Sequence, residues 1–300
     1  MKRVVVAGGA GFVGRQALKP LSQAGFEVHV IDLKPLHDDV AGIIQHTVDL
    51  FDVASLRSTF EQIKPTHLLN FAWFTQHGEY WTSEHNFRSL AGNFKILELF
   101  AEAGGQRVVM AGTCAEYDWH NGACIEEQTP LRPITVYGSC KLAMYELLKS
   151  YAQVKGLSWA WGRIFFVFGP AENSRRFVPA IIVPLLKGET APCSHGNQIR
   201  DFMATLDVGS AFAALTYSEM QGAVNIASGQ PVCLRNLAET IGNIIDAPGL
   251  IKYGAVSSPK DEAPIIIAAT DRLRRELGWR PERTLEERLS ETVEWWRQNV

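Results

Sequence analysis

The feature that most constrains this chain is a run of glycines near its start. Residues 4–7 are apolar, residues 8–14 read Gly-Gly-Ala-Gly-Phe-Val-Gly, and residues 15–24 have a helix-like pattern. Glycine permits positive φ in a tight turn and lets the backbone come close to a ligand. The helix that follows offers free N–H groups and a positive dipole end to an anion. This order predicts a site for a dinucleotide pyrophosphate; the alternative is an ordinary tight turn in an α/β protein.

An acidic residue in the right place strengthens this prediction. Residues 27–31 form a second strand-like run, and Asp32 ends it, about twenty residues beyond the turn, where a carboxylate accepts hydrogen bonds from an adenosine ribose. Such a carboxylate repels the 2′-phosphate of NADP, so NAD is the predicted cofactor; Lys34 is close enough in sequence to leave NADP possible. The residues of the turn expected to contact the cofactor are Gly8, Gly11, Phe12, Val13 and Gly14, and Gly9 offers a second, overlapping G-x-G-x-x-G spacing.

Composition limits the possible partners. The 300 residues are 46% hydrophobic and 20% charged with a net charge of −3, so we expect a globular protein without an electrostatic nucleic-acid surface. No apolar run reaches transmembrane length, and the N-terminal run stops too early for a signal peptide. The five cysteines are scattered without zinc or redox spacing, which predicts no metal site and a reducing, cytoplasmic location.

Strand-like and helix-like segments alternate through the first half of the chain. This order predicts an α/β fold: a Rossmann-like, doubly wound parallel sheet that binds ligands at the carboxyl ends of its strands. The rhythm changes after Gly169-Pro170, where short elements and many prolines follow. We therefore expect a nucleotide-binding domain at 1–169 and a smaller C-terminal α/β substrate lobe at 170–300, with some exchange of chain between them. Expected strands are 2–7, 27–31, 45–48, 67–71, 107–111 and 158–166, and expected helices are 15–24, 55–63, 83–103, 135–155 and 285–296.

A tyrosine and a lysine four residues apart provide candidate chemistry. Tyr137 and Lys141 would lie one turn apart on the same face of a helix. A phenol titrates near 10, and a nearby ammonium or an oxidised nicotinamide would favour the phenolate. The phenol could then exchange a proton with a substrate oxygen while a hydride moves to or from the cofactor. The alternative is a surface pair on a helix, because this spacing also arises by chance.

These motifs together resemble the extended short-chain dehydrogenase/reductases, specifically the nucleotide-sugar epimerase/dehydratase group. The resemblance covers nearly the whole chain. Besides the glycine turn, Asp32 and the Tyr137/Lys141 pair, it rests on five segments: 49–50, 70–73, 163–170, 196–208 and 225–229, with 277–281 as a late match.

The resemblance implies roles for further residues. Asp49 and Leu50 are similar to the family's adenine-contacting pair, and Phe71 and Ala72 lie in the segment that follows the fourth strand beside the cofactor. Thr113 matches the catalytic Ser/Thr, whose hydroxyl orients the reacting oxygen toward Tyr137; the alternative is an ordinary strand-end threonine. Arg200 matches an arginine that binds the substrate's pyrophosphate; the alternative is an ion pair with Asp201 or Asp207.

Departures from the family pattern narrow the chemistry. Cys114 and Ala115 replace the Asp-Glu pair of sugar 4,6-dehydratases, which makes elimination of water doubtful. Glu116 stands at an apolar position and is expected either to hold a structural hydrogen bond or to touch substrate. Phe166 replaces the usual Asn, and both Phe166 and Trp73 are expected at the substrate. Trp73, Phe74, His77, Tyr80 and Trp81 either stack on a sugar or base or close the pocket floor.

With elimination of water doubtful, the reaction that these residues favour is hydride transfer at a carbinol or ketone carbon. We expect an NAD(P)-dependent 4-ketoreductase or 4-epimerase whose partner is a nucleoside-diphosphate sugar. Two alternatives stay open at this point: a reductase of a non-nucleotide carbonyl compound, and an NAD(P)-sensing binding protein without turnover. The resemblance also implies a homodimer, in which helices 83–103 and 135–155 pair with the same helices of a partner through Phe87, Leu90, Leu142 and Tyr145.

Overall fold

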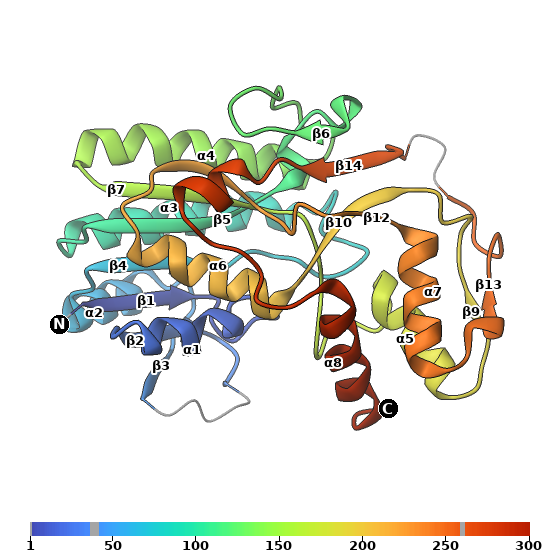
Figure 1. Cartoon of the computed structure of the whole chain (residues 1–300). Helices are drawn as coiled ribbons and strands as arrows, with labels where there is room; N and C mark the ends of the chain where they lie inside the picture. Colours follow the sequence, from blue (N-terminus) through green and yellow to red (C-terminus); the bar gives the residue numbers. More distant parts are fainter. Residues whose placement is uncertain (1, 37–41, 259–261) are drawn as a thin grey trace.

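The centre of the molecule is a parallel sheet, as the alternation of segments predicts. The computed structural model describes residues 2–36, 42–258 and 262–300. Its seven-stranded sheet has the order β11-β7-β5-β4-β1-β2-β3 with every neighbouring pair parallel (Figure 1). The strands are β1 Arg3–Ala7, β2 Glu27–Asp32, β3 Ile43–Thr47, β4 His67–Asn70, β5 Arg107–Thr113, β7 Ser158–Ile164 and β11 Gly222–Ile226.

Helices cover both faces of this sheet because successive strand residues point to opposite sides. Val4 and Val6 pack with helices α1 and α6, whereas Val5 between them packs with α2, α3 and α4. In Figure 1, α1 and α6 lie on the near side of the strands and α3 on the far side. The helices are α1 Arg15–Gln23, α2 Val53–Ile63, α3 His85–Glu102, α4 Val136–Lys155 and α6 Thr205–Tyr217.

A second, smaller layer of strands lies beyond the carboxyl ends of the large sheet (Figure 1). Strand order there is β12-β10-β14-β6, with β8 paired to β10, and a separate ladder joins β13 to β9. Helices α5, α7 and α8 pack together in one apolar cluster with residues of β10. The elements are β6 Ala123–Cys124, β8 Phe166–Phe168, α5 Phe177–Leu186, β9 Ala191–Pro192, β10 Ile199–Ala204, β12 Pro231–Cys233, α7 Leu234–Ile245, β13 Ile251–Lys252, β14 Ile265–Ala268 and α8 Leu285–Arg297. Short helical turns lie at Cys114–Glu116, Trp119–Asn121, Pro248–Leu250 and Arg272–Glu276.

The chain crosses between the two layers more than once. The apolar run expected as one strand at 158–166 breaks at Phe165: β7 stays in the large sheet and β8 pairs with β10. After β10 the chain returns, so that α6 and β11 complete the large sheet from positions well beyond 170. The division at residue 169 stays a prediction, and α6 and β11 are the segments that would be exchanged across it.

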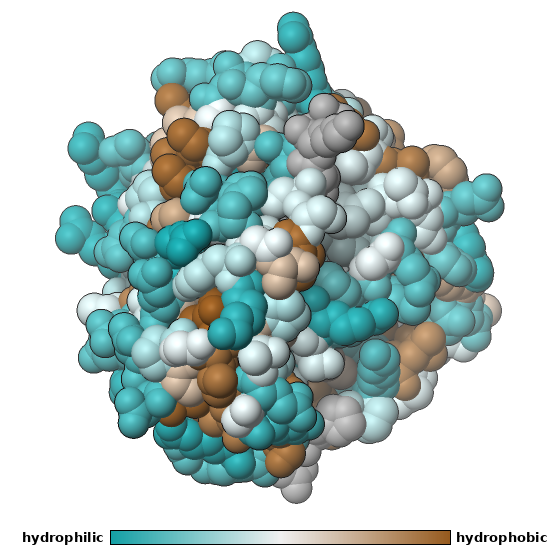
Figure 2. Space-filling view, turned by 90° about the vertical axis from the view of Figure 1, so that its right-hand side faces the viewer, coloured by the Kyte–Doolittle hydropathy of each residue, from teal (hydrophilic) through white to brown (hydrophobic). Residues whose placement is uncertain are grey.

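The surface around the smaller layer is polar. Figure 2 shows the side of the molecule that carries α7, β9 and β13 at the right of Figure 1. Hydrophilic residues dominate this face, and hydrophobic residues gather in small separate groups, as is usual for a surface in contact with water. Among the described residues, no helix has the length and apolar character needed to cross a membrane.

Candidate active site

A large pocket opens where β1, β4 and β5 end. Its volume is about 1440 Å³, and it runs from the glycine turn and Asp32 to Thr113 and Arg200. The carboxyl ends of parallel strands meet along this edge, which is where open α/β sheets bind ligands. The pocket is lined by every candidate site residue inferred from the sequence except Glu116: Gly8, Gly11, Phe12, Val13, Gly14, Asp32, Asp49, Leu50, Phe71, Ala72, Trp73, Thr113, Tyr137, Lys141, Phe166 and Arg200.

The glycine turn forms a tight backbone cradle. Gly8 has a φ of 73°, and a Cβ on it would lie 2.8 Å from the backbone nitrogen of Ala72. A Cβ on Gly14 would lie 2.2 Å from the carbonyl oxygen of Gly8, so no side chain fits there either. Helix α1 begins directly after Gly14 and presents its N-terminal end to the pocket. This cradle fits a dinucleotide pyrophosphate, which needs close backbone approach and a helix N-terminus.

Asp32 is held by the backbone at the end of β2. Its Oδ2 accepts from the N–H of Ala10 at 3.1 Å, and its Oδ1 accepts from the N–H of Lys34 at 3.0 Å. The carboxylate therefore links the glycine turn to the second strand. Each carboxylate oxygen has further lone pairs that can accept ribose hydroxyls. This is the geometry expected for a dinucleotide with a free 2′-hydroxyl.

The segment after β4 is fixed by asparagines. Asn70, the last residue of β4, accepts from the N–H of Ala72 at 2.9 Å and donates to Asn93 at 2.7 Å. Asn93 in turn donates to the carbonyl of Ala72 at 2.8 Å. Both asparagines are buried. The two amides hold the backbone of Ala72 against the glycine turn, and sequence reasoning missed Asn93 because only tertiary packing brings it there.

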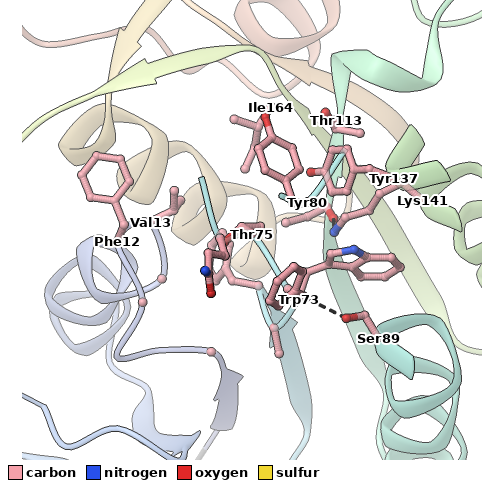
Figure 3. A pocket seen from close by; sticks show the side chains of 18 of the residues that line it. Phe12, Val13, Trp73, Thr75, Tyr80, Ser89, Thr113, Tyr137, Lys141 and Ile164 are labelled. Carbon is pink, nitrogen blue, oxygen red and sulfur yellow. Dashed lines mark hydrogen bonds between the residues drawn. The ribbon is translucent and has the colours of Figure 1, made fainter. Parts of the chain in front are cut away.

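Thr113, Tyr137 and Lys141 converge in the pocket (Figure 3). The Thr113 hydroxyl lies close enough to the phenol of Tyr137 to favour a lower phenol pKa, against the larger effect of burial. Lys141 donates to the carbonyl of Ala111 at 2.7 Å, and its ammonium lies 4.0 Å from the centre of the Trp73 ring. The sequence pairing of Tyr137 with Lys141 one turn apart thus brings both to the end of β5, on helix α4.

Burial governs the titration of this group. Desolvation raises the pKa of the Tyr137 phenol above its usual range, and Tyr80 adds to the increase. Desolvation also lowers the pKa of Lys141 to about 7, although the carboxylate of Glu116 opposes this shift. In the protein alone the phenol is therefore protonated. Lys141 alone does not lower the pKa of Tyr137 as the sequence suggested. A second positive charge near the phenol oxygen is needed to favour the phenolate.

Aromatic residues surround Tyr137. Tyr80 and Trp81 meet its ring edge-to-face, with centroids 5.0 and 5.8 Å away. Trp73 contacts it from another side at 6.5 Å and donates its indole N–H to Asn86 at 2.9 Å. These rings exclude water from the phenol and line the pocket, whereas their stacking on a sugar or base stays a prediction.

The substrate contact expected of Glu116 is corrected by the structure. Glu116 is 0% exposed and lies behind Thr113, outside the pocket lining. Its Oε1 accepts from the N–H of Thr113 at 2.8 Å and from the Trp161 indole at 3.0 Å. Its Oε2 accepts from Nε of the equally buried Arg163 at 2.6 Å. The structural alternative therefore holds: Glu116 fixes the backbone of Thr113 and pairs with a buried arginine.

Arg200 lies in the pocket with a partner that sequence reasoning did not foresee. Its Nη2 donates to Glu262 at 2.9 Å, rather than to Asp201 or Asp207. Asp201 accepts from Ser228 instead, and Asp207 pairs with an arginine of α8. The guanidinium also lies over the ring of Phe166, 5.4 Å from its centre. Phe166 and Arg200 therefore meet in the pocket, but the charge of Arg200 is already compensated.

Two further pocket residues carry no sequence signal that identifies them. Arg176 and Glu262 both line the pocket, and each comes from a segment without a recognisable motif. Arg176 directly precedes helix α5 and pairs with Glu172 at 2.8 Å. Burial raises the pKa of Glu172 to about 7, an effect that Arg176 opposes.

Comparisons with known proteins agree with this geometry. The family model described as "NAD dependent epimerase/dehydratase family" matches residues 4–227. A curated UDP-glucose 4-epimerase of Streptomyces lividans is 26% identical over 98% of this chain and 95% of its own length. A dTDP-6-deoxy-L-talose 4-dehydrogenase (NAD(+)) of Aggregatibacter actinomycetemcomitans is 25% identical over 79% of this chain and 88% of its own. The crystal structure of the UDP-glucose 4-epimerase of Thermus thermophilus in complex with NAD is similar with a TM-score of 0.87 and 25% identity, over 99% of this chain and 100% of that one.

Proposed function

This chain belongs to the NAD-dependent epimerase/dehydratase family, and on that premise we propose that it moves a hydride at a carbinol or ketone carbon of a nucleoside-diphosphate sugar, as a 4-epimerase or a 4-ketoreductase. It is an enzyme of the short-chain dehydrogenase/reductase type, and its cofactor is NAD. The observation that carries the proposal is the meeting of Thr113, Tyr137 and Lys141 in the pocket that also contains the glycine cradle.

The cofactor would be held along the carboxyl edge of the sheet. The cradle at Gly8 to Gly14 would take the pyrophosphate and Asp32 the adenosine ribose. Asp49 and Leu50 would contact the adenine, and Phe71 and Ala72 would line the path toward Thr113. When bound, NAD supplies the hydride acceptor or donor and, in its oxidised form, a positive charge.

The side chains of this protein supply the proton. Tyr137 exchanges a proton with the reacting oxygen of the sugar, because its phenol lies beside the Thr113 hydroxyl in the pocket and is shielded from water by Tyr80. The Thr113 hydroxyl orients the same oxygen. Lys141, adjacent to Tyr137 and fixed by Ala111, adds charge that favours the phenolate. Trp73 and Phe166 are proposed to contact the sugar.

Two substrates separate the proposed activities. With NAD and UDP-glucose, a 4-epimerase forms UDP-galactose without net formation of NADH, which chromatography and NADH absorbance detect. With NADH and a nucleoside-diphosphate 4-keto-sugar, a ketoreductase consumes NADH in proportion to product. The proposal fails if neither reaction occurs with protein that binds NAD. Reduction of a small ketone without a nucleotide would then favour the carbonyl reductase, and inertness toward both would favour a sensing protein.

We also propose a homodimer in the cytoplasm. Helices α3 and α4 pack side by side, and their outer faces expose apolar side chains: Phe87 is 58% exposed and Val154 is 80% exposed. Leu142 is half-buried, whereas Leu90 and Tyr145 pack against the core, so they contribute less area than the sequence suggests. The five free cysteines suit a reducing compartment. Light scattering at micromolar concentration tests the dimer, and a monomeric mass contradicts it.

A further inference from the structure

The arginines that line the pocket differ in how many acceptors of the protein their guanidinium groups already contact. Arg15 donates to the carbonyl of Pro170 at 2.5 Å. Arg88 stacks over Phe51, 4.8 Å from its centre, beside the turn that contains Asp49. Arg200 lies over the ring of Phe166, and Arg176 is close enough to Tyr80 to affect the pKa of its phenol. They are therefore the candidates to meet a negatively charged part of the substrate.

Arg200 is committed to the protein itself. Its Nη1 donates to the carbonyls of Ile199 and Pro264 at 2.9 and 3.2 Å. Its Nη2 donates to Glu262 at 2.9 Å and to the carbonyl of Ala263 at 2.8 Å. Both terminal nitrogens thus have protein acceptors, and a carboxylate compensates the charge. A phosphate could reach this guanidinium only after the bond to Glu262 breaks.

Arg176 contacts fewer acceptors of the protein than Arg200 does. Its Nε faces Glu172 Oε1 at 2.8 Å, and its guanidinium is close enough to Tyr80 to oppose the rise that burial causes in the pKa of that phenol. The side chain is 30% exposed, while that of Glu172 is buried, so the arginine reaches from a buried anchor into the pocket. Tyr80 lies against Tyr137 (Figure 3). Arg176 is therefore one side chain away from the candidate proton donor.

The surroundings of Arg176 are positively charged. Burial together with the charges of Arg176 and Arg175 lowers the pKa of His77. Glu172 is the carboxylate paired with Arg176. The planar guanidinium, whose Nε pairs with Glu172, matches the oxygens of a phosphate or a carboxylate through its other N–H donors.

We propose that Arg176, rather than Arg200, binds the anionic group of the substrate, with Glu172 and Tyr80 as the residues that orient it. This rests on the proposed function, since it assumes a nucleoside-diphosphate sugar in the same pocket. The anion is either the diphosphate or a carboxylate on the sugar. The two share one chemistry, a group with several negatively charged oxygens.

The test is isothermal titration calorimetry of the full chain saturated with NAD, with UDP and uridine as probes. Arg176→Met should weaken UDP binding about tenfold or more and leave uridine binding within about threefold. Arg175→Met removes the same charge from an exposed neighbour and should leave both within about threefold. Arg200→Met should cost less UDP affinity than Arg176→Met. A larger loss of UDP affinity with Arg200→Met would exclude the diphosphate as the anion that Arg176 binds and leave only a sugar carboxylate, which the next ligands test.

A second pair of ligands identifies the anion. If UDP binding is unchanged in Arg176→Met but UDP-glucuronate binds more weakly relative to UDP-glucose, the arginine binds a sugar carboxylate and the proposal stands. If all three ligands bind Arg176→Met as they bind wild type, the proposal is wrong. Failure of wild type to bind any of them at millimolar concentration instead removes the nucleotide-sugar function, and this assignment with it.

The fold of the variant needs its own control. Arg176→Met leaves the buried Glu172 without its partner, so NAD affinity and circular dichroism are measured in parallel. The double variant Glu172→Gln/Arg176→Met removes both charges and should show the same loss of UDP or UDP-glucuronate binding. Normal binding by a folded double variant would also refute the proposal.

Discussion

The pair of Glu116 and Arg163 yields a prediction of large effect. Both side chains are 0% exposed, and the carboxylate accepts from Arg163, Trp161 and the backbone of Thr113. Glu116→Gln keeps the shape but removes the charge and turns an amide N–H toward Arg163. Removing one partner of a buried ion pair typically costs about 3–5 kcal/mol, because the other charge stays buried and uncompensated.

The structure places the expected cost at the lower end of that range. Arg163 keeps a hydrogen bond with the Tyr117 hydroxyl at 3.1 Å and lies over the rings of Tyr117 and Tyr145, at 4.8 and 4.9 Å. We therefore expect Glu116→Gln to lose about 3 kcal/mol in the free energy of unfolding. Urea unfolding followed by circular dichroism, with linear extrapolation to water, measures it.

A double variant separates stability from catalysis. Glu116→Val/Arg163→Met replaces both charges with apolar groups and should recover most of the lost stability. It does not restore the acceptor for the Thr113 N–H, so its kcat should stay low while KM changes little. A loss below about 1 kcal/mol in Glu116→Gln would refute the buried-pair reasoning. Recovery of full kcat in the double variant would show that Glu116 does not position Thr113.

Three further outcomes are expected. Tyr137→Phe should lose about a hundredfold to ten-thousandfold in kcat and still bind NAD, because only the proton donor is removed; turnover near the wild-type rate would exclude Tyr137 from the mechanism. Titration with both cofactors should show tighter binding of NAD than of NADP, since Asp32 repels a 2′-phosphate; the reverse order contradicts this. The pKa of Glu172, raised by burial from 4.5 to about 7, means that the folded protein holds a proton between these pH values that the unfolded chain releases. Stability should therefore fall as pH rises through that window, and Glu172→Gln should remove this slope and be about 2–4 kcal/mol more stable than wild type above pH 7; equal pH profiles would show that Glu172 is not shifted.

Local patterns carried most of the fold prediction. The glycine turn, the alternating strands and helices, and the Tyr137/Lys141 spacing each depend on residues close in sequence, and each element formed within a few residues of its expected place. The fold class follows from them and is confirmed by the parallel sheet and the family match. The break at Phe165 escaped prediction because its cause, pairing of β8 with β10, involves a strand more than thirty residues away.

Partners of charged residues were the least predictable part of the site. Glu262 is 62 residues from Arg200, and Tyr80 is nearly a hundred residues from Arg176, so no local pattern links them. The local sequence also could not decide whether the side chain of Glu116 points into the pocket or into the core. It sits next to the end of a strand, and only the presence of buried Arg163 on β7 decides that its carboxylate turns inward. The chemical roles of the site residues remain predictions that the proposed variants test.

The path of the chain through the large sheet has a consequence for biosynthesis. Helix α6 covers one face of the sheet, where Phe212 lies 4.8 Å from Phe71, and β11 supplies the strand beyond β7. A fragment that stopped at residue 169 would leave the edge of β7 unpaired and that face uncovered, which invites aggregation. On the ribosome, the nucleotide-binding half cannot close until Ile226 has emerged, by which time α5 and β10 have been made as well. We therefore expect the two layers to mature together, and a fragment that ends at residue 169 to aggregate rather than fold alone.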